Sequence, residues 1–255
     1  MEICGLSNKV ALITGGSSGL GRESAIAFAD AGAKVVIADI DARGGEKTAQ
    51  TIADQNGNVL FVKADVSKSH QVNQLIQQVV KTYGRLDCAH NNAGIEGELA
   101  KTGDCSEDNW NNVIQTNLKS TWLCLKFEIL QMVQQASGTI VNTSSVYGLV
   151  GSERGLPAYV ASKHGIVGLT KTAALEYACS GIRVNAVCPG AIDTPFRKRL
   201  IDKNHEKNLE CYKRYPIGRI GRPDEVANAV VWLCSEAASY ITGSVLTIDG
   251  GLTAK

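Results

Sequence analysis

Short apolar runs alternate along this chain with longer segments of helical periodicity. The apolar runs predict buried strands at 9–14, 34–39, 58–63, 86–90, 138–143, 183–188 and 245–248. The segments between them predict helices at 20–31, 42–55, 68–83, within 107–136, from Tyr159 to about residue 179, and at 224–235. This alternation predicts a doubly wound α/β fold, with a mostly parallel sheet of about seven strands covered by helices on both faces. A ligand is expected at the carboxyl ends of such strands.

The length and charge of the chain narrow the possible partners. No Pro/Ser-rich or charge-dense linker divides the 255 residues, so we expect a single domain over 1–255. The 26 basic and 25 acidic side chains leave a net charge of +1. A chain with this balance shows no overall positive charge of the kind that binds nucleic acid or an anionic membrane. No apolar run approaches the roughly 18 residues that span a bilayer, and residues 1–9 lack a signal-peptide pattern. We expect a cytoplasmic protein.

The eight cysteines predict neither disulfides nor a metal site. They form no CxxC pair and no Cys/His cluster with zinc spacing. Several lie inside apolar runs, as Cys188 and Cys234 do, where a free thiol behaves as a small hydrophobic group. We therefore expect reduced, mostly buried thiols.

Tyr159 and Lys163 lie four residues apart in a predicted helix, so their side chains share one face. A tyrosine pKa is ordinarily about 10. One positive charge about 4 Å away, at an effective dielectric near 20, supplies about 4 kcal/mol, enough to bring that pKa near 7. Tyr159 could then give and take a proton at neutral pH. A chance pairing on an ordinary helix remains the alternative for these two residues alone.

A glycine-rich turn follows the first predicted strand and opens the first predicted helix. Its sequence is Thr14-Gly-Gly-Ser-Ser-Gly-Leu-Gly21. Glycines let the backbone approach a pyrophosphate, and the N-terminus of the following helix attracts its charge. The spacing does not match GxGxxG, so a turn without a ligand remains the alternative. The position between strand and helix favours a dinucleotide site of the Rossmann type.

Asp39 ends the second predicted strand, eighteen residues after Gly21. A carboxylate there can accept hydrogen bonds from the ribose hydroxyls of an adenosine and would repel a 2′-phosphate. Ile40, rather than a basic residue, follows it. These residues favour NAD(H) over NADP(H), although Arg22 and Arg43 could in principle reach a phosphate.

Taken together, the motifs resemble those of the classical short-chain dehydrogenase/reductase family. The matches cover nearly the whole chain in the family's order: Thr14–Gly21, Asp65-Val66, Asn91-Asn92-Ala93-Gly94, Asn117, Ser144-Ser145, Tyr159-x-x-x-Lys163, Pro189-Gly190 and Ile248-Asp-Gly-Gly251. Each motif is weak by itself, but the combination is highly specific. The resemblance implies an NAD(H)-dependent oxidoreductase that interconverts a secondary alcohol and a ketone by hydride transfer, without a metal.

The resemblance also implies catalytic roles for four residues. Tyr159 would be the general acid and base, while Lys163 would lower its pKa and bind the nicotinamide ribose, aided by the positive charge of the oxidised nicotinamide. Ser145 would hold the substrate oxygen. The loop before Tyr159 is about one residue longer than expected, around 152–156, which leaves Ser144 as the alternative serine. Asn117 would distort its helix and hold a water that leads to Lys163.

The coenzyme contacts are likewise carried over from the family. Asp65 and Val66 would hold the adenine, and Ile192 and Thr194 would contact the nicotinamide carboxamide. The full set of expected coenzyme residues is Gly15, Ser17, Ser18, Gly19, Leu20, Gly21, Asp39, Asp65, Val66, Asn92, Ala93, Gly94, Tyr159, Lys163, Pro189, Gly190, Ile192 and Thr194. Structural alternatives remain for Asn91-Asn92 and for Pro189-Gly190, which could serve as strand-end turns.

The substrate is less constrained than the chemistry. Residues 195–216 occupy the family's variable lid and are rich in Lys and Arg, which would suit an anionic substrate or simply an exposed helix. Glu96, Glu98, Glu153 and Arg154 lie in loops expected near the pocket and could bind polar groups or be solvated. The family resemblance implies a homotetramer. Two other functions remain open: a non-catalytic NAD(H) sensor, and an epimerase or dehydratase of the same superfamily.

Overall fold

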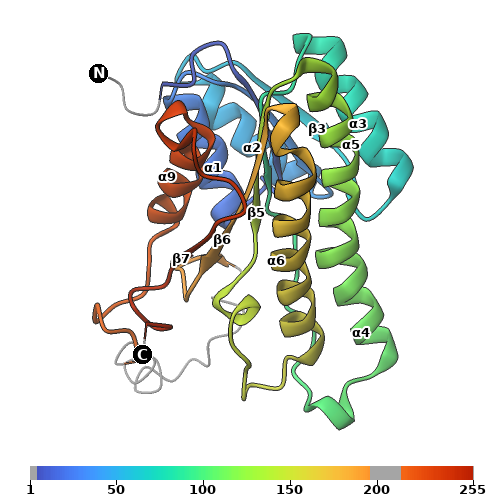
Figure 1. The fold of residues 1–255 in the computed structure, drawn as a ribbon, viewed down its shortest axis with the longest axis vertical. Coiled ribbons are helices and arrows are strands. Elements are labelled where there is room, and N and C mark those ends of the chain that lie inside the picture. The colour runs from blue at the N-terminus through green and yellow to red at the C-terminus, as the bar shows by residue number, and fades with distance from the viewer. Residues whose placement is uncertain (1–4, 196–213, 255) are drawn as a thin grey trace.

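The computed structural model describes residues 5–195 and 214–254, whose strands form a seven-stranded parallel sheet (Figure 1). The strands are β1 (Val10–Thr14), β2 (Lys34–Asp39), β3 (Val59–Lys63), β4 (Cys88–Asn91), β5 (Gly138–Thr143), β6 (Ile182–Pro189) and β7 (Val245–Ile248). Their order is β3-β2-β1-β4-β5-β6-β7, so the direction of winding reverses between β1 and β4. The predicted doubly wound, Rossmann-type fold is confirmed, and such a reversal places a ligand crevice at the carboxyl ends of the strands.

Helices cover both faces of the sheet (Figure 1). One layer contains α1 (Gly19–Asp30), α2 (Ala42–Ala53) and α9 (Pro223–Cys234), and the other contains α3 (Ser69–Tyr83), α5 (Ser120–Gln135) and α6 (Pro157–Tyr177). The short helix α4 (Glu107–Val113) continues the line of α5 at one end.

The central strands are buried on both faces, as their uninterrupted apolar sequences require. In β1, Val10 and Leu12 pack into the core under α3 and α5. Ala11 and Ile13 point the other way, into the core under α1 and α9. This two-residue alternation divides the apolar residues of one strand between two separate hydrophobic cores.

The long helix predicted within 107–136 is interrupted in the structure. A π-helical segment, Ile114–Lys119, separates α4 from α5. Asn117 lies in this segment with 0% of its surface exposed. The single extra residue in a π turn redirects side chains on the helix, and such segments occur frequently at functional sites.

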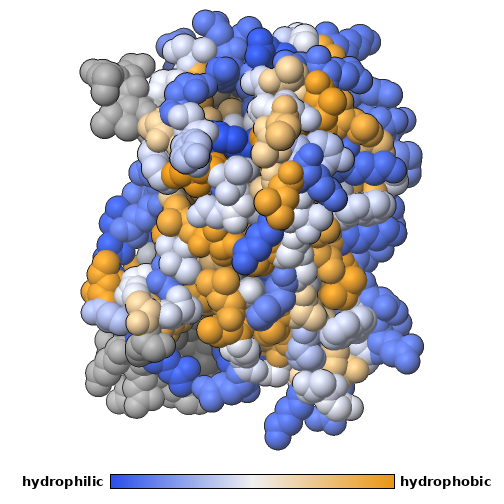
Figure 2. Space-filling model, viewed as in Figure 1, coloured by the Kyte–Doolittle hydropathy of each residue, from blue (hydrophilic) through white to orange (hydrophobic). Residues whose placement is uncertain are grey.

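Hydrophobic side chains gather over α5 and α6 on the face shown in Figure 2. The large apolar residues exposed on these helices are Trp122, Leu130, Val133 and Leu175, the last with 84% of its surface accessible. Of the helices in the described part of the chain, none combines the length and the apolar character that a membrane crossing needs. The described cysteines are all free thiols, and Cys88, Cys124, Cys188 and Cys234 are buried as predicted.

Candidate active site

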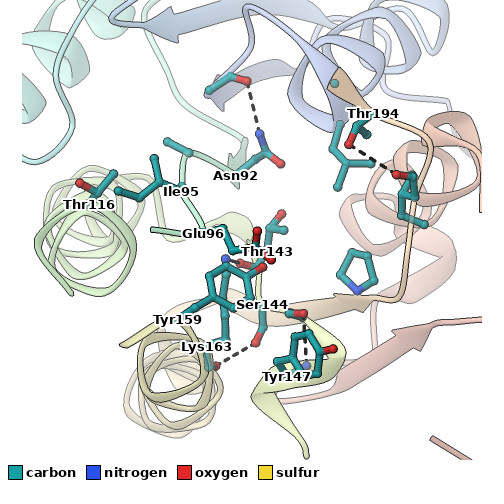
Figure 3. A pocket seen from close by; sticks show the side chains of 18 of the residues that line it. Asn92, Ile95, Glu96, Thr116, Thr143, Ser144, Tyr147, Tyr159, Lys163 and Thr194 are labelled. Atoms are coloured by element: carbon teal, nitrogen blue, oxygen red, sulfur yellow. Dashed lines mark hydrogen bonds between the residues drawn. The ribbon is translucent and has the colours of Figure 1, made fainter. Parts of the chain in front are cut away.

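A large pocket lies along the carboxyl ends of the strands and has a volume of about 1300 Å³ (Figure 3). Sites for one small ligand usually occupy about 300–1,000 Å³, so this pocket has room for more than one small molecule. All the predicted site residues line it except Gly21 and Asn117. The structure therefore brings together motifs that are spread from residue 15 to residue 194.

The glycine-rich turn after β1 is shaped by close backbone approaches. Gly15 has a φ of +68°, and a Cβ there would lie 2.9 Å from Ala93 Cα. A Cβ on Gly21 would lie 2.1 Å from Gly15 O, so Gly21 serves the packing of α1 against the turn. Ser18 precedes α1 without a side-chain capping hydrogen bond. The first N–H groups of α1 therefore lie at the pocket without a capping side chain, and they can donate hydrogen bonds to an anion.

Asp39 is fixed by two backbone groups at the end of β2. Its Oδ2 accepts a hydrogen bond from Ser17 N at 2.9 Å, and its Oδ1 accepts one from Asp41 N at 2.9 Å. Each oxygen retains a lone pair for a further donor. Of the described residues, the lining at this end includes Asp39, Ile40 and Asp41 but neither Arg22 nor Arg43.

Asp65 and Val66 line the pocket in the turn after β3. Asp65 Oδ1 accepts from Ser67 N at 2.9 Å, while Asp65 N donates to Gln71 Oε1 at 2.8 Å. These bonds fix the turn that the family resemblance assigns to the adenine.

Asn92 joins the turn after β4 to the turn after β1. Its Nδ2 donates to Thr14 O at 3.2 Å, and its backbone N donates to Thr14 Oγ1 at 3.0 Å. Asn91 instead points into the core, where its Nδ2 donates to Glu128 Oε2 at 2.9 Å and to Asn142 Oδ1 at 3.0 Å. The alternative reading of this motif, a purely structural role at the end of a strand, therefore applies to Asn91 and partly to Asn92.

The two serines after β5 differ in their hydrogen bonds. Both are buried and both line the pocket. Ser144 Oγ donates its proton to Lys163 O at 2.8 Å, whereas Ser145 Oγ accepts from Tyr147 N at 3.2 Å. The Ser145 hydroxyl also lowers the pKa of Tyr159 through a side-chain hydrogen bond. The geometry therefore favours Ser145 for the substrate oxygen.

Lys163 and Tyr159 share a face of α6, as predicted. Lys163 is 4% exposed, its Nζ donates to Thr143 O at 2.8 Å, and this nitrogen lies 5.5 Å from the centroid of the Tyr159 ring. Tyr147 packs edge-on against the Tyr159 ring, with centroids 6.5 Å apart. Thr143 and Tyr147 are contacts that no sequence motif identified.

Burial opposes the expected fall of the Tyr159 pKa toward 7. Burial raises the pKa of Tyr159 above its ordinary value, and the Glu96 charge adds to that rise, while the Ser145 hydroxyl opposes it. Burial also lowers the pKa of Lys163 to about 8. The sequence argument left out the cost of burying both charges, which disfavours the phenolate and the ammonium alike.

Asn117 lies behind the pocket and holds the loop that follows β4. Its Oδ1 accepts from Ile95 N at 2.8 Å, and its Nδ2 donates to Ile95 O at 2.8 Å and to Ser162 Oγ at 3.1 Å. The predicted distortion of its helix is present as the π-helical segment. The predicted water beside Lys163 stays a prediction.

Most of the predicted basic lid lies outside the described residues, including Arg197, Lys198, Arg199, Lys203, Lys207 and Lys213. Arg214, at its end, pairs with Glu153 across 3.5 Å. Tyr215 also lines the pocket, and its hydroxyl accepts a hydrogen bond from Ala191 N at 3.1 Å.

A doubly wound sheet with a glycine turn, an acidic residue after β2 and a Ser-Tyr-Lys group in one pocket defines a nucleotide-dependent oxidoreductase. Residues 15–253 match a family model described as enoyl-(acyl carrier protein) reductase. The chain belongs to the short-chain dehydrogenase/reductase family of oxidoreductases.

Individual relatives span nearly the whole chain. A cyclohexanol dehydrogenase from Acinetobacter sp. (strain SE19) is 42% identical, over 98% of this chain and 96% of its own. A 3-oxoacyl-[acyl-carrier-protein] reductase from Chlamydia trachomatis is 43% identical, over 97% and 98%. The crystal structure of levodione reductase superposes with a TM-score of 0.94 at 38% identity, over 97% of this chain and 98% of that one.

Proposed function

We propose that this protein is an NAD(H)-dependent dehydrogenase or ketoreductase that interconverts a cyclic secondary alcohol and its ketone. The observation that carries the proposal is the presence of Ser145, Tyr159 and Lys163 in one pocket with the glycine turn. The similarity to a cyclohexanol dehydrogenase supports a cyclic alcohol as the first substrate to test.

Tyr159 moves the proton in this proposal. Its hydroxyl receives the proton of the alcohol during oxidation and returns it to the oxygen during ketone reduction. The Ser145 hydroxyl donates to the same substrate oxygen and stabilises the charge that develops there, a preorganised electrostatic role. Lys163, when protonated, places a positive charge next to Tyr159 and favours its phenolate.

The residues fit a dinucleotide coenzyme. The cradle formed by Gly15 and Gly21 has no room for side chains, and the N-terminus of α1 lies beside it. The Asp39 carboxylate and exposed Ile40 favour NAD(H) over a coenzyme with a 2′-phosphate. When bound, the coenzyme would supply the hydride acceptor for alcohol oxidation and the hydride for ketone reduction.

The two rival functions make different demands on the site. A protein that only senses NAD(H) has no need for Ser145, Tyr159 and Lys163 together. An epimerase or dehydratase would use the same tyrosine and lysine without net oxidation of the substrate. Net reduction of the coenzyme during turnover separates the proposed function from both.

The deciding experiment follows reduced-nicotinamide absorbance with cyclohexanol in the presence of NAD⁺ or NADP⁺, and with cyclohexanone in the reverse direction. We expect turnover with a clear preference for NAD⁺. Tyr159→Phe should retain coenzyme binding, measured by fluorescence titration, and lose nearly all turnover. Wild-type turnover in that variant would refute the role of Tyr159, and a preference for NADP⁺ would refute the coenzyme assignment.

We also propose a homotetramer assembled through α5 and α6. The exposed apolar side chains of these helices, Trp122, Leu130, Val133 and Leu175, support an interface there. A monomer in light scattering would exclude it.

A further inference from the structure

Glu96 is a buried carboxylate in the wall of the active-site pocket. It lies in the loop after β4, lines the pocket and is 8% exposed. Its Oε2 is fully buried and has no hydrogen-bond partner among the described residues. Since a buried polar atom without a partner is costly, this oxygen requires an explanation.

The loop that carries Glu96 is held on both sides by asparagine side chains. Asn117 bonds both the N–H and the carbonyl of Ile95, each at 2.8 Å. Asn109 Oδ1 accepts from Glu98 N at 3.0 Å, while Asn109 Nδ2 donates to Glu98 O at 3.1 Å. Each asparagine thus pairs with the backbone as a neighbouring strand would. The backbone on either side of Glu96 is fixed before any substrate binds.

The glycine between these clamps allows the loop to pack tightly. Gly97 has a φ of +80°, and a Cβ there would lie 2.4 Å from Val113 Cγ2 and 2.7 Å from Asn109 Oδ1. A side chain at position 97 would therefore collide with α4, and the glycine lets the loop pack directly against this helix. A carboxylate preorganised in this way resembles a binding group rather than a solvated loop residue.

Glu96 is electrostatically connected to the reacting group. Burial raises the pKa of Glu96, and the nearby Arg154 lowers it. The charge of Glu96 in turn contributes to the raised pKa of Tyr159. A molecule that contacts the Tyr159 hydroxyl would therefore also lie close to Glu96, which lines the same pocket (Figure 3).

We propose that Glu96 binds a second hydroxyl group of the substrate, so that the enzyme prefers cyclic diols to alcohols with one hydroxyl. As a carboxylate, Glu96 can only accept hydrogen bonds, so its partner must be a donor. A hydroxyl remote from the reacting carbon supplies one donor to the Glu96 carboxylate in the pocket wall. A substrate without that group leaves the carboxylate unpaired, which a built polar site penalises strongly. This inference rests on the proposed alcohol dehydrogenase function and specifies its substrate.

The test compares kcat and KM for cyclohexanol with those for 1,2-, 1,3- and 1,4-cyclohexanediols. A charge-assisted hydrogen bond lost from a buried site corresponds to a change of about 50-fold. We expect kcat/KM of the wild-type protein to favour at least one diol by about that factor. The gain should appear mainly in KM, because the contact is the same in ground and transition states.

Substitution of Glu96 should remove this preference. Glu96→Leu should raise KM for the preferred diol and lower it for cyclohexanol, so that the ratio of kcat/KM approaches one. Glu96→Gln retains an acceptor oxygen and the side-chain size, so it should keep part of the preference if Glu96→Leu does not fold. Both variants should shift the pH profile of alcohol oxidation to lower pH, since they remove a negative charge beside Tyr159.

Glu98→Gln is the matched control. Glu98 is exposed, lies in the same loop and carries the same charge, and its side chain is not part of the described pocket lining. It should leave the diol preference unchanged. Equal kcat/KM for cyclohexanol and every diol in the wild-type protein, or a preference that survives Glu96→Leu and Glu96→Gln, would overturn this inference alone. Absence of turnover with every alcohol would instead overturn the proposed function and this inference with it.

Discussion

Glu128 offers a quantitative test of the buried network beneath the active site. This α5 residue is 0% exposed, and its Oε2 accepts from Asn91 Nδ2 at 2.9 Å. Asn91 in turn bonds Asn142, whose Nδ2 donates to Thr170 Oγ1 at 2.9 Å. The chain of polar groups ties α5 to the ends of β4 and β5 and to α6. Its other carboxylate oxygen, Oε1, has no partner among the described residues.

The pKa of Glu128 sets the size and sign of the effect. Burial raises this pKa from 4.5 to about 7, against the opposing hydrogen bond from Asn91. Each pKa unit is worth about 1.4 kcal/mol, so ionisation in the folded protein costs about 3 kcal/mol. The folded protein holds this proton more tightly than the unfolded chain does. Its stability therefore falls as pH rises from about 4.5 to 7, and the full cost applies above about pH 7.

Glu128→Gln removes the ionisable group and should remove this pH dependence. We expect the difference in free energy of unfolding between variant and wild type to increase by about 3 kcal/mol from about pH 5 to about pH 8. The increase is independent of any constant cost of burying the new amide. Urea denaturation followed by circular dichroism, at one protein concentration, measures it at each pH.

A control separates Glu128 from general charge effects. Glu176→Gln removes an exposed carboxylate on α6 and supplies the baseline for the loss of one acidic side chain at each pH. If the Glu128→Gln difference does not change with pH by more than this baseline, the carboxyl group of Glu128 is not held in its acid form by burial, and the reasoning fails.

Two further substitutions test the coenzyme turn and the catalytic lysine. Gly21→Ala places a Cβ 2.1 Å from Gly15 O, so it should displace α1 and abolish the rise in melting temperature that NAD⁺ produces; an unchanged rise would contradict the predicted close packing. Lys163→Met should stop turnover yet raise the free energy of unfolding at pH 7 by up to about 3 kcal/mol, because burial lowers the pKa of Lys163 from 10.5 to about 8. That stabilisation should shrink as pH rises from about 8 toward 10.5. Thermal denaturation of variant and wild type at several pH values measures it, and a stabilisation that does not change with pH would contradict the lowered pKa of Lys163.

The fold could be predicted from sequence because its signal is local and repeated. The first helix was expected at 20–31 and spans Gly19–Asp30, since strand and helix periodicities change abruptly at the glycine turn. The site could be located because parallel strands bring their carboxyl ends to one edge. The π-helical segment at Asn117 was expected only from the family resemblance, because it depends on bonds to Ile95, a residue distant in sequence.

The electrostatics of the site could not be predicted from sequence either. Spacing placed Lys163 on the same face as Tyr159, but burial determines both of their pKa values, and burial is a property of the folded chain. Glu128 lies between Phe127 and Ile129 and has no sequence feature that marks it as buried. Glu96 lies two residues after Gly94, the last residue of the family motif, and only the structure distinguishes it from its exposed neighbour Glu98.

Asn117 explains how the coenzyme and substrate parts of the pocket are held together. Both N–H groups of its side chain and one lone pair of its Oδ1 are used by Ile95 and Ser162, so in this structure the amide acts on the site by positioning other groups. A Cβ on Gly94 would lie 3.1 Å from Asn117 Oδ1 and 3.8 Å from Lys163 Nζ, so the loop passes closely between the asparagine and the lysine. This loop begins with the coenzyme-binding motif, which ends at Gly94, and continues to Glu96. The π-helical distortion therefore places Asn117 where it can fix one loop that borders both the coenzyme and the substrate parts of the pocket.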